Sequence, residues 1–345
     1  MKKFDEIARL LVPERPRAAV ELHTGLAGRL SWRLERAGRI IDAGEQRNLI
    51  TDAGLDAWAL CGYKYGSYIT TDPFRAEGAL GTGSTAPATG DTSLVAEIAD
   101  TADGGNDSVA SQGIASGEEV LAAEKTYVWD FTGAHNLTEW GLRPSGGSLS
   151  VRSLFYEADG TTPKTISVQT NDRLTLVHTL EVTAAPVGTN VAATWTVTEY
   201  DRAGTDLGDT VLSGWMTIGS DGDKAKDRLM MVMPERHKYR RHVRGHSAAL
   251  TGLNPAEDYP SQTTYSAEAT VTLSAYSAGS YTRDQVWAIG AADANGVWQG
   301  WSLVVSGYYS NHGAGGLMFA FDGQTWEKLN THTAQLTITT TWGRT

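Results

Sequence analysis

The sequence predicts an all-β fold, an antiparallel β-sandwich with a large insertion and a short N-terminal helical arm. Segments of alternating apolar and polar residues dominate from residue 28 onward, and turns rich in glycine and proline separate them. No alternation of strand-like and helix-like segments occurs, which argues against a doubly wound α/β fold. We therefore expect helix in fewer than about a fifth of the residues.

The N-terminus is predicted to form a short amphipathic helix. Phe4, Ile7 and Leu11 fall on one side of this helix, and Pro13 ends it. A single helix cannot bury such a stripe alone. Residues 1–27 are therefore predicted to be an arm that docks on its own domain or on a neighbouring subunit.

Residues 28–345 are predicted to form the β-sandwich domain. One further short helix is expected near its start, with Thr51 or Asp52 as the N-cap. The charged stretch at about 220–262, which includes a basic run at 236–246, is expected to leave the sheets as an excursion.

The charge balance limits the partners of this chain. Its 345 residues carry 40 acidic and 29 basic side chains, a net charge of −11, so the molecule as a whole repels nucleic acid. The basic run is interpreted as a solvated loop, as an ion-pair patch between subunits, or as a site for an acidic surface. We expect no signal peptide and no membrane span, because no apolar stretch has the required length.

No metal site is predicted. Among the eight histidines, His242 and His246 are four residues apart, which is a ligand spacing only on a helix, and arginines surround them. The aspartate-rich stretches 201–209 and 221–223 favour turns, with a calcium loop as the alternative.

Catalytic patterns are also missing. The glycine-rich stretch 81–90 lacks the Lys-Ser or Lys-Thr pair of a phosphate-binding loop. Glu139, beside Trp140, is the one acidic residue whose neighbourhood suggests a sugar-cleaving site, and it has no evident second carboxylate. Cys61, the lone cysteine, is expected in the core. We predict a non-enzymatic protein without cofactors.

A series of short turn-and-strand blocks follows one another between residues 28 and 344. The blocks are NLITDAGLD at 48–56, GTGSTAP at 81–87, DTSL at 91–94, LTEWGL at 137–142, VRSLF at 151–155, DGTTPKTISV at 159–168, DRLTL at 172–176 and LTITTTWGR at 336–344. In this order they resemble a group of tailed-bacteriophage structural proteins that are described as tail proteins. The resemblance implies a virion component of the tail or host-contact apparatus and supplies no catalytic residues.

The predicted function is therefore that of a virion structural protein of the tail apparatus, made in the host cytoplasm. It is expected to assemble as a homo-oligomer, a trimer or a higher ring, with other virion proteins as partners. One alternative is a receptor-binding adhesin or tail fibre protein that recognises host surface glycan. The other is a head-decoration protein that binds the capsid lattice.

The C-terminal half carries the candidate receptor contacts, which are aromatic or lie in a glycine-containing loop. They are Trp298, Trp301, Tyr308, Tyr309 and His312. Trp298 and Trp301 are three residues apart, so on a regular strand they point to opposite faces. We expect one of these two rings to be exposed.

Overall fold

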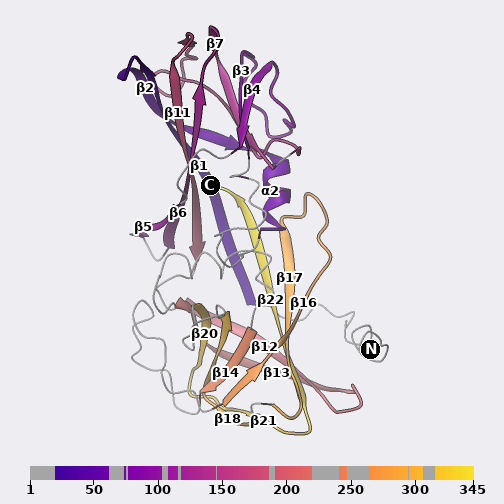
Figure 1. The fold of residues 1–345 in the computed structure, drawn as a ribbon. Coiled ribbons are helices and arrows are strands. Elements are labelled where there is room, and N and C mark those ends of the chain that lie inside the picture. Colours follow the sequence, from indigo (N-terminus) through magenta and orange to yellow (C-terminus); the bar gives the residue numbers. More distant parts are fainter. Residues whose placement is uncertain are drawn as a thin grey trace.

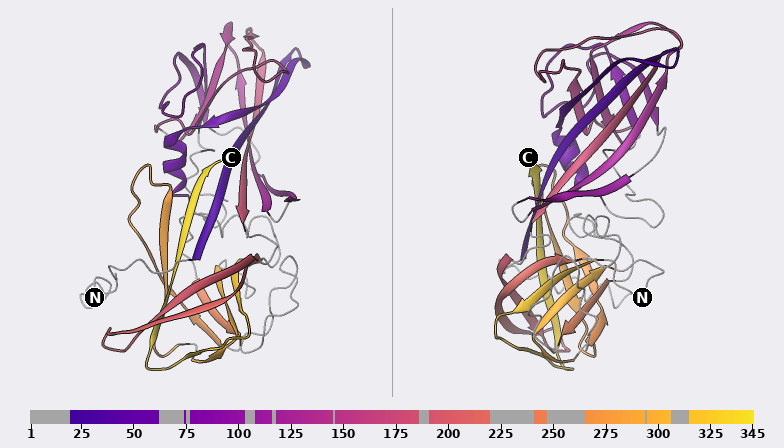
Figure 2. Two further views of the ribbon diagram at one scale, coloured as in Figure 1. Left: turned by 180° about the vertical axis from the view of Figure 1, so that it is seen from behind. Right: turned by 90° about the vertical axis from the view of Figure 1, so that its left-hand side faces the viewer.

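The computed structural model of this protein describes residues 20–61, 74, 77–102, 108–115, 118–144, 146–185, 191–219, 241–246, 265–293, 295–305 and 315–345. They form two β-sheet lobes stacked end to end, and the long strands β1 (Val20–Arg36) and β22 (Thr333–Arg344) run between the lobes (Figure 1, Figure 2). The one helix in these ranges is α2 (Asp52–Trp58), so the predicted all-β fold is confirmed.

The first lobe is a sandwich of two sheets. Besides β1 it contains β2 (Arg39–Ile50), β3 (Glu77–Gly81), β4 (Glu97–Ala102), β5 (Ser108–Ala115), β6 (Glu118–Asp130), β7 (His135–Leu137), β8 (Glu139–Arg143), β9 (Val151–Leu154), β10 (Ile166–Val168) and β11 (Arg173–Ala185). One sheet has the order β5–β6–β11–β1–β2, and the other has the order β4–β3–β8–β9. The end of β2 also pairs with β9, which closes one side of the sandwich, and β7 pairs with β10.

The two sheets of this lobe bury alternate residues of their strands against each other. On β1, Trp32 and Leu34 are buried, and their partner strand β11 buries Leu174. Across the core, the Trp140 ring of β8 lies 6.1 Å from the His178 ring of β11, measured between ring centroids. This inward-facing alternation is what holds two sheets together in a sandwich.

The second lobe is one long sheet that curves around its own core. Besides β22 it contains β12 (Val191–Tyr200), β13 (Asp206–Gly219), β14 (Arg241–His246), β15 (Tyr265–Glu268), β16 (Thr270–Leu273), β17 (Thr282–Ile289), β18 (Gly296–Trp298), β19 (Gly300–Val305), β20 (Gly315–Phe321) and β21 (Trp326–Lys328). The strand order is β15–β14–β19–β20–β13–β12–β22–β17–β16, and β18 and β21 form a separate ribbon.

Strands β1 and β22 join the lobes by a parallel pairing. Residues Val20 to Leu26 of β1 lie beside Ile338 to Arg344 of β22, whereas the next part of the same edge of β1 pairs with β2. The sequence predicts an antiparallel sandwich and gives no signal for this parallel pairing. Adjacent hairpins force antiparallel pairing, but β1 and β22 come from opposite ends of the chain and no turn fixes their direction.

Helix α2 is clamped between the lobes. Its N-cap is Thr51, one of the two residues predicted for this position, and the Thr51 hydroxyl accepts a hydrogen bond from the Gly54 amide at 3.0 Å. From the second lobe, the Tyr276 hydroxyl donates to Asp56 Oδ1 at 2.6 Å, and the Trp342 indole donates to the Leu55 carbonyl at 2.8 Å. These hydrogen bonds to the helix connect the second lobe to the first.

Two predicted boundaries differ from the structure. Strand β1 begins at Val20, inside the range 1–27 that was assigned to the arm. Gly28 does not break this strand, because its missing Cβ leaves room for the Asn48 side chain. Strand β14 lies inside the predicted excursion at 220–262 and pairs with β15 and β19, so this part of the basic run belongs to the sheet.

Candidate functional site

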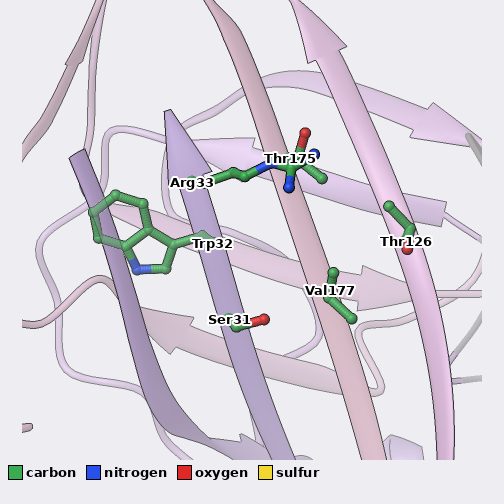
Figure 3. A pocket seen from close by; sticks show the side chains of 6 residues that line it. All are labelled: Ser31, Trp32, Arg33, Thr126, Thr175 and Val177. Carbon is green, nitrogen blue, oxygen red and sulfur yellow. The ribbon is translucent and has the colours of Figure 1, made fainter. Parts of the chain in front are cut away.

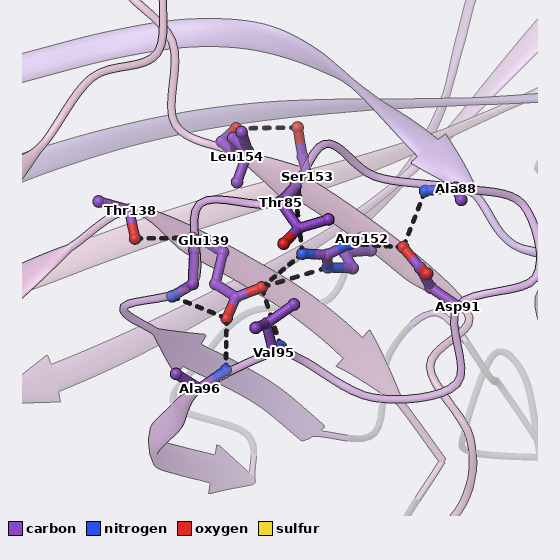
Figure 4. A network of polar contacts seen from close by, with 11 residues as sticks. Thr85, Ala88, Asp91, Val95, Ala96, Thr138, Glu139, Arg152, Ser153 and Leu154 are labelled. Atoms are coloured by element: carbon purple, nitrogen blue, oxygen red, sulfur yellow. Dashed lines mark hydrogen bonds and ion pairs between the residues drawn. The ribbon is translucent and has the colours of Figure 1, made fainter.

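The polar centre of the first lobe is a buried ion pair between Glu139 and Arg152. Glu139 begins β8, Arg152 lies on the neighbouring strand β9, and their side chains are 0% and 1% exposed. Arg152 Nη2 lies 2.8 Å from Glu139 Oε2, and its Nη1 lies 2.5 Å from Asp91 Oδ2 (Figure 4). One guanidinium group thus connects two carboxylates of different segments.

These charges hold the long loop between β3 and β4. The Glu139 carboxylate accepts hydrogen bonds from the amides of Gly83, Val95 and Ala96 at 3.0, 3.2 and 2.9 Å. Arg152 also donates to the Thr85 carbonyl at 2.9 Å. Both ends of the loop are therefore pinned to the same carboxylate (Figure 4).

Glycine at position 83 allows this loop to approach the buried carboxylate. A Cβ on Gly83 would collide with Glu139 Oε1, so only glycine lets the backbone come this close. The glycine-rich stretch that begins at residue 81 therefore approaches the buried Glu139 carboxylate, an anion that belongs to the protein.

The network keeps its carboxylates ionised. Burial raises the pKa of Glu139, but the amides of Ala96 and Val95 and the Arg152 guanidinium outweigh it, so the pKa lies below its usual value. Burial likewise raises the pKa of Asp91, and the Ala88 amide and Arg152 bring it below its usual value. A general acid for sugar cleavage needs a raised pKa and access to substrate. Glu139 has neither property.

The prediction that Trp298 or Trp301 is exposed is wrong, because the two residues are 0% and 1% exposed. Strand β18 ends at Trp298 and β19 begins at Gly300, so the chain changes direction between them and the alternation restarts. Both rings enter the same core, with centroids 6.2 Å apart, and the Trp326 ring packs against each of them. In the described part of the chain these residues are core.

The other predicted contact residues lie outside the described ranges. These are Phe4, Ile7 and Leu11 of the arm, and Tyr308, Tyr309 and His312 of the aromatic cluster. Their proposed roles stay predictions.

The candidate metal-ligating residues lie on a strand and in a turn where the structure describes them. His242 and His246 lie on strand β14, so they do not have the helical spacing of metal ligands. The carboxylate of Asp201 accepts hydrogen bonds from the amides of Ala203 and Thr205, both at 2.8 Å, as in an aspartate turn. Residues 221–223 lie outside the described ranges. Within those ranges, no group of three or more metal-ligating side chains occurs.

The outer face of the β6–β11–β1 sheet contains a shallow hollow of about 310 Å³. Ser31, Val177 and Thr126 form one cross-strand row of its floor, and Arg33 and Thr175 form the next (Figure 3). Arg33 also forms an ion pair with Glu35 at 3.0 Å. Hydroxyl groups and a guanidinium group in such a hollow suit a polyol or an anion.

Trp32 also borders this hollow, but its ring belongs to the interior. The residue is 3% exposed, and its ring packs edge-on against Phe155 with centroids 5.9 Å apart. The hollow therefore offers no exposed aromatic platform from this residue.

Arg152, Asp91 and the surface hollow were not identified from the sequence. Arg152 stands among apolar residues of a strand, which is a weak signal for a buried charge. Nothing local indicates that its partner lies on β8.

Comparison with known protein families, with curated proteins and with solved structures finds no match to this chain. Among the described residues, no helix has the length and apolar character needed to cross a membrane.

Proposed function

We propose that this chain is a non-enzymatic structural protein of a tailed-bacteriophage virion, placed in the tail apparatus and assembled as an oligomer with other virion proteins. The proposal rests on the ordered sequence blocks that resemble tail proteins and on the structural use of those blocks.

The observation that carries the proposal is the Glu139–Arg152 network. The blocks at 81–87, 91–94, 137–142 and 151–155 supply Gly83, Asp91, Glu139 and Arg152. These residues meet around the buried Glu139–Arg152 pair, where the Glu139 carboxylate and the Arg152 guanidinium fix a loop and are shielded from solvent. A network that holds a loop in one conformation is what we expect in a structural subunit.

The experiment is to locate the protein in purified virions of the phage that encodes it. Quantitative mass spectrometry should find it in a fixed ratio to other tail proteins, and gold-labelled antibodies should bind the tail. Labelling of the capsid would favour head decoration instead. Absence from virions, while the protein is abundant in infected cells, would contradict the proposal.

A second candidate function, glycan recognition by an adhesin, draws on the hollow of the first lobe. Its floor presents hydroxyl groups from Ser31, Thr126 and Thr175 beside the Arg33 guanidinium. Ser31→Tyr should fill the hollow, with Thr194→Tyr on β12 as the matched control. Slower host adsorption by normally assembled Ser31→Tyr particles alone would favour the adhesin. Equal adsorption of both variants would argue against it.

A further inference from the structure

Lys328 is a buried lysine at the end of β21 in the second lobe. Only 1% of the residue is exposed, and it shares its buried side with Trp326 while Glu327 between them is exposed. An ammonium group in this position has lost its water. It therefore needs acceptors from the protein to remain charged.

Four oxygen atoms surround the Lys328 Nζ atom. The backbone carbonyls of His332, Leu329 and Ala291 lie 2.5, 3.0 and 3.3 Å away, and Asn295 Oδ1 lies 3.3 Å away. A lysine ammonium has three N–H donors, so this cage supplies more acceptors than its hydrogen bonds require. Carbonyl oxygens that replace a hydration shell are also the ligands by which proteins bind potassium.

The oxygens that accept hydrogen bonds from Nζ all belong to uncharged groups, but carboxylates nearby favour a cation in the cage. Burial lowers the pKa of Lys328, and the nearby carboxylates of Asp293 and Glu199 oppose this effect. Glu199 also lies 3.3 Å from His332 Nδ1, so its carboxylate reaches the turn that supplies the cage. Neutral oxygens thus contact the Lys328 ammonium directly, and the carboxylates of Asp293 and Glu199 lie outside them.

We propose that this cage is a monovalent-cation site that the chain fills with its own ammonium group. The oxygens come from two turns, one between β17 and β18 and one between β21 and β22. The cation therefore ties together two turns near the ribbon β18–β21, at the end of the second lobe (Figure 1). Without the lysine side chain, the vacated site takes a free potassium, ammonium or methylammonium ion.

The test uses the full chain and the variants Lys328→Ala and Lys328→Met. Thermal unfolding is followed at constant ionic strength, with chloride salts of N-methylglucamine, potassium, ammonium or methylammonium. We expect both variants to unfold several degrees below the wild type in N-methylglucamine, which is too large for the cage. The small cations should raise the unfolding temperature of Lys328→Ala in a saturable way, as expected for a ligand that binds only the folded state. Lys328→Met should not recover, because its side chain fills the site.

Lys164→Ala is the matched control. The Lys164 ammonium lies 2.9 Å from Asp42 and 3.4 Å from Glu157. It is therefore paired with carboxylates, whereas the Lys328 ammonium is held by carbonyl oxygens. A recovery of Lys164→Ala equal to that of Lys328→Ala would mark a general salt effect and overturn the proposal. So would a Lys328→Met variant as stable as the wild type, or a Lys328→Ala variant that responds to no small cation. If Lys328→Ala does not fold in N-methylglucamine, refolding yield replaces the unfolding temperature, and a yield independent of the cation overturns the proposal.

Discussion

At the scale of single residues, Glu139 and Arg152 illustrate how much a buried charge depends on its partner. Glu139→Gln would leave the Arg152 guanidinium buried with Asp91 as its remaining carboxylate. Asp91 still compensates the guanidinium charge, but the charged acceptor that Arg152 shares with three backbone amides is lost. We expect the free energy of unfolding to fall by about 1.5–3 kcal/mol, because hydrogen bonds to a charged group contribute about that much. Urea unfolding followed by tryptophan fluorescence measures this change.

The control for this substitution is Glu45→Gln. Glu45 also pairs with an arginine, Arg29, at 3.0 Å, but its side chain is 57% exposed. Water and salt screen such a pair, so its loss should cost less than about 1 kcal/mol. Equal effects of the two substitutions would show that burial of the Glu139 pair has no energetic consequence.

The same network predicts a loss of stability in acid. The pKa values of Glu139 and Asp91 are lowered in the folded state, whereas unfolded Glu and Asp titrate near about 4.3 and 3.9. The stability that each contributes is fully present above its unfolded pKa, and it is lost as the pH falls through its folded pKa. The stability difference between wild type and Glu139→Gln should therefore shrink below about pH 4. Urea midpoints over a pH series test this, and a difference that stays constant down to about pH 2 would contradict it.

At the scale of elements, the turn between β1 and β2 starts a long strand pairing of the first lobe, whose register then shifts by one residue between Glu35 and Leu34. Ala37 and Gly38 both have positive φ angles, 51° and 75°, and Arg36 pairs with Arg39 across the turn. Such a two-residue turn favours Asn-Gly, because asparagine tolerates the left-handed region better than alanine.

Ala37→Asn should therefore stabilise the protein by about 0.5–1 kcal/mol, and Gly38→Ala should destabilise it by about 1 kcal/mol. A Cβ on Gly38 would meet no atom within 4 Å, so the second effect arises from the backbone alone. Urea unfolding provides both values. If neither substitution changes the free energy of unfolding, the turn conformation is not as described.

At the scale of the whole molecule, the amphipathic stripe predicted for the N-terminal arm is the feature that suggests assembly. Phe4, Ile7 and Leu11 make up this predicted stripe. Changing all three to Asp should lower the oligomeric state measured by analytical ultracentrifugation, because the stripe then cannot bury itself on a neighbour. The double variant Asp5→Ser and Arg9→Ser, which changes charged residues of the same arm, is the control. Unchanged sedimentation of the triple variant would remove the arm from assembly.

Features that depend on neighbouring residues could be predicted from the sequence. Alternating polarity predicted the strands, the helix cap was narrowed to Thr51 or Asp52, and lone Cys61 was placed in the core, where the structure buries it. The turn at Asp159-Gly160 is equally local, because Asp159 accepts hydrogen bonds from the amides of Thr161 and Thr162. Caps, turns and strand periodicity are local because each is decided within a few residues.

Contacts between distant residues, in contrast, became known from the three-dimensional structure. The parallel pairing of β1 with β22, the Glu139–Arg152 ion pair and the cage around Lys328 each join segments that no local pattern connects. Trp298 and Trp301 are a further example, because one strand ends and another begins between them, and both rings therefore point into the same core. A period of two predicts opposite faces only while the strand continues, and where a strand ends is decided by the strands packed beside it.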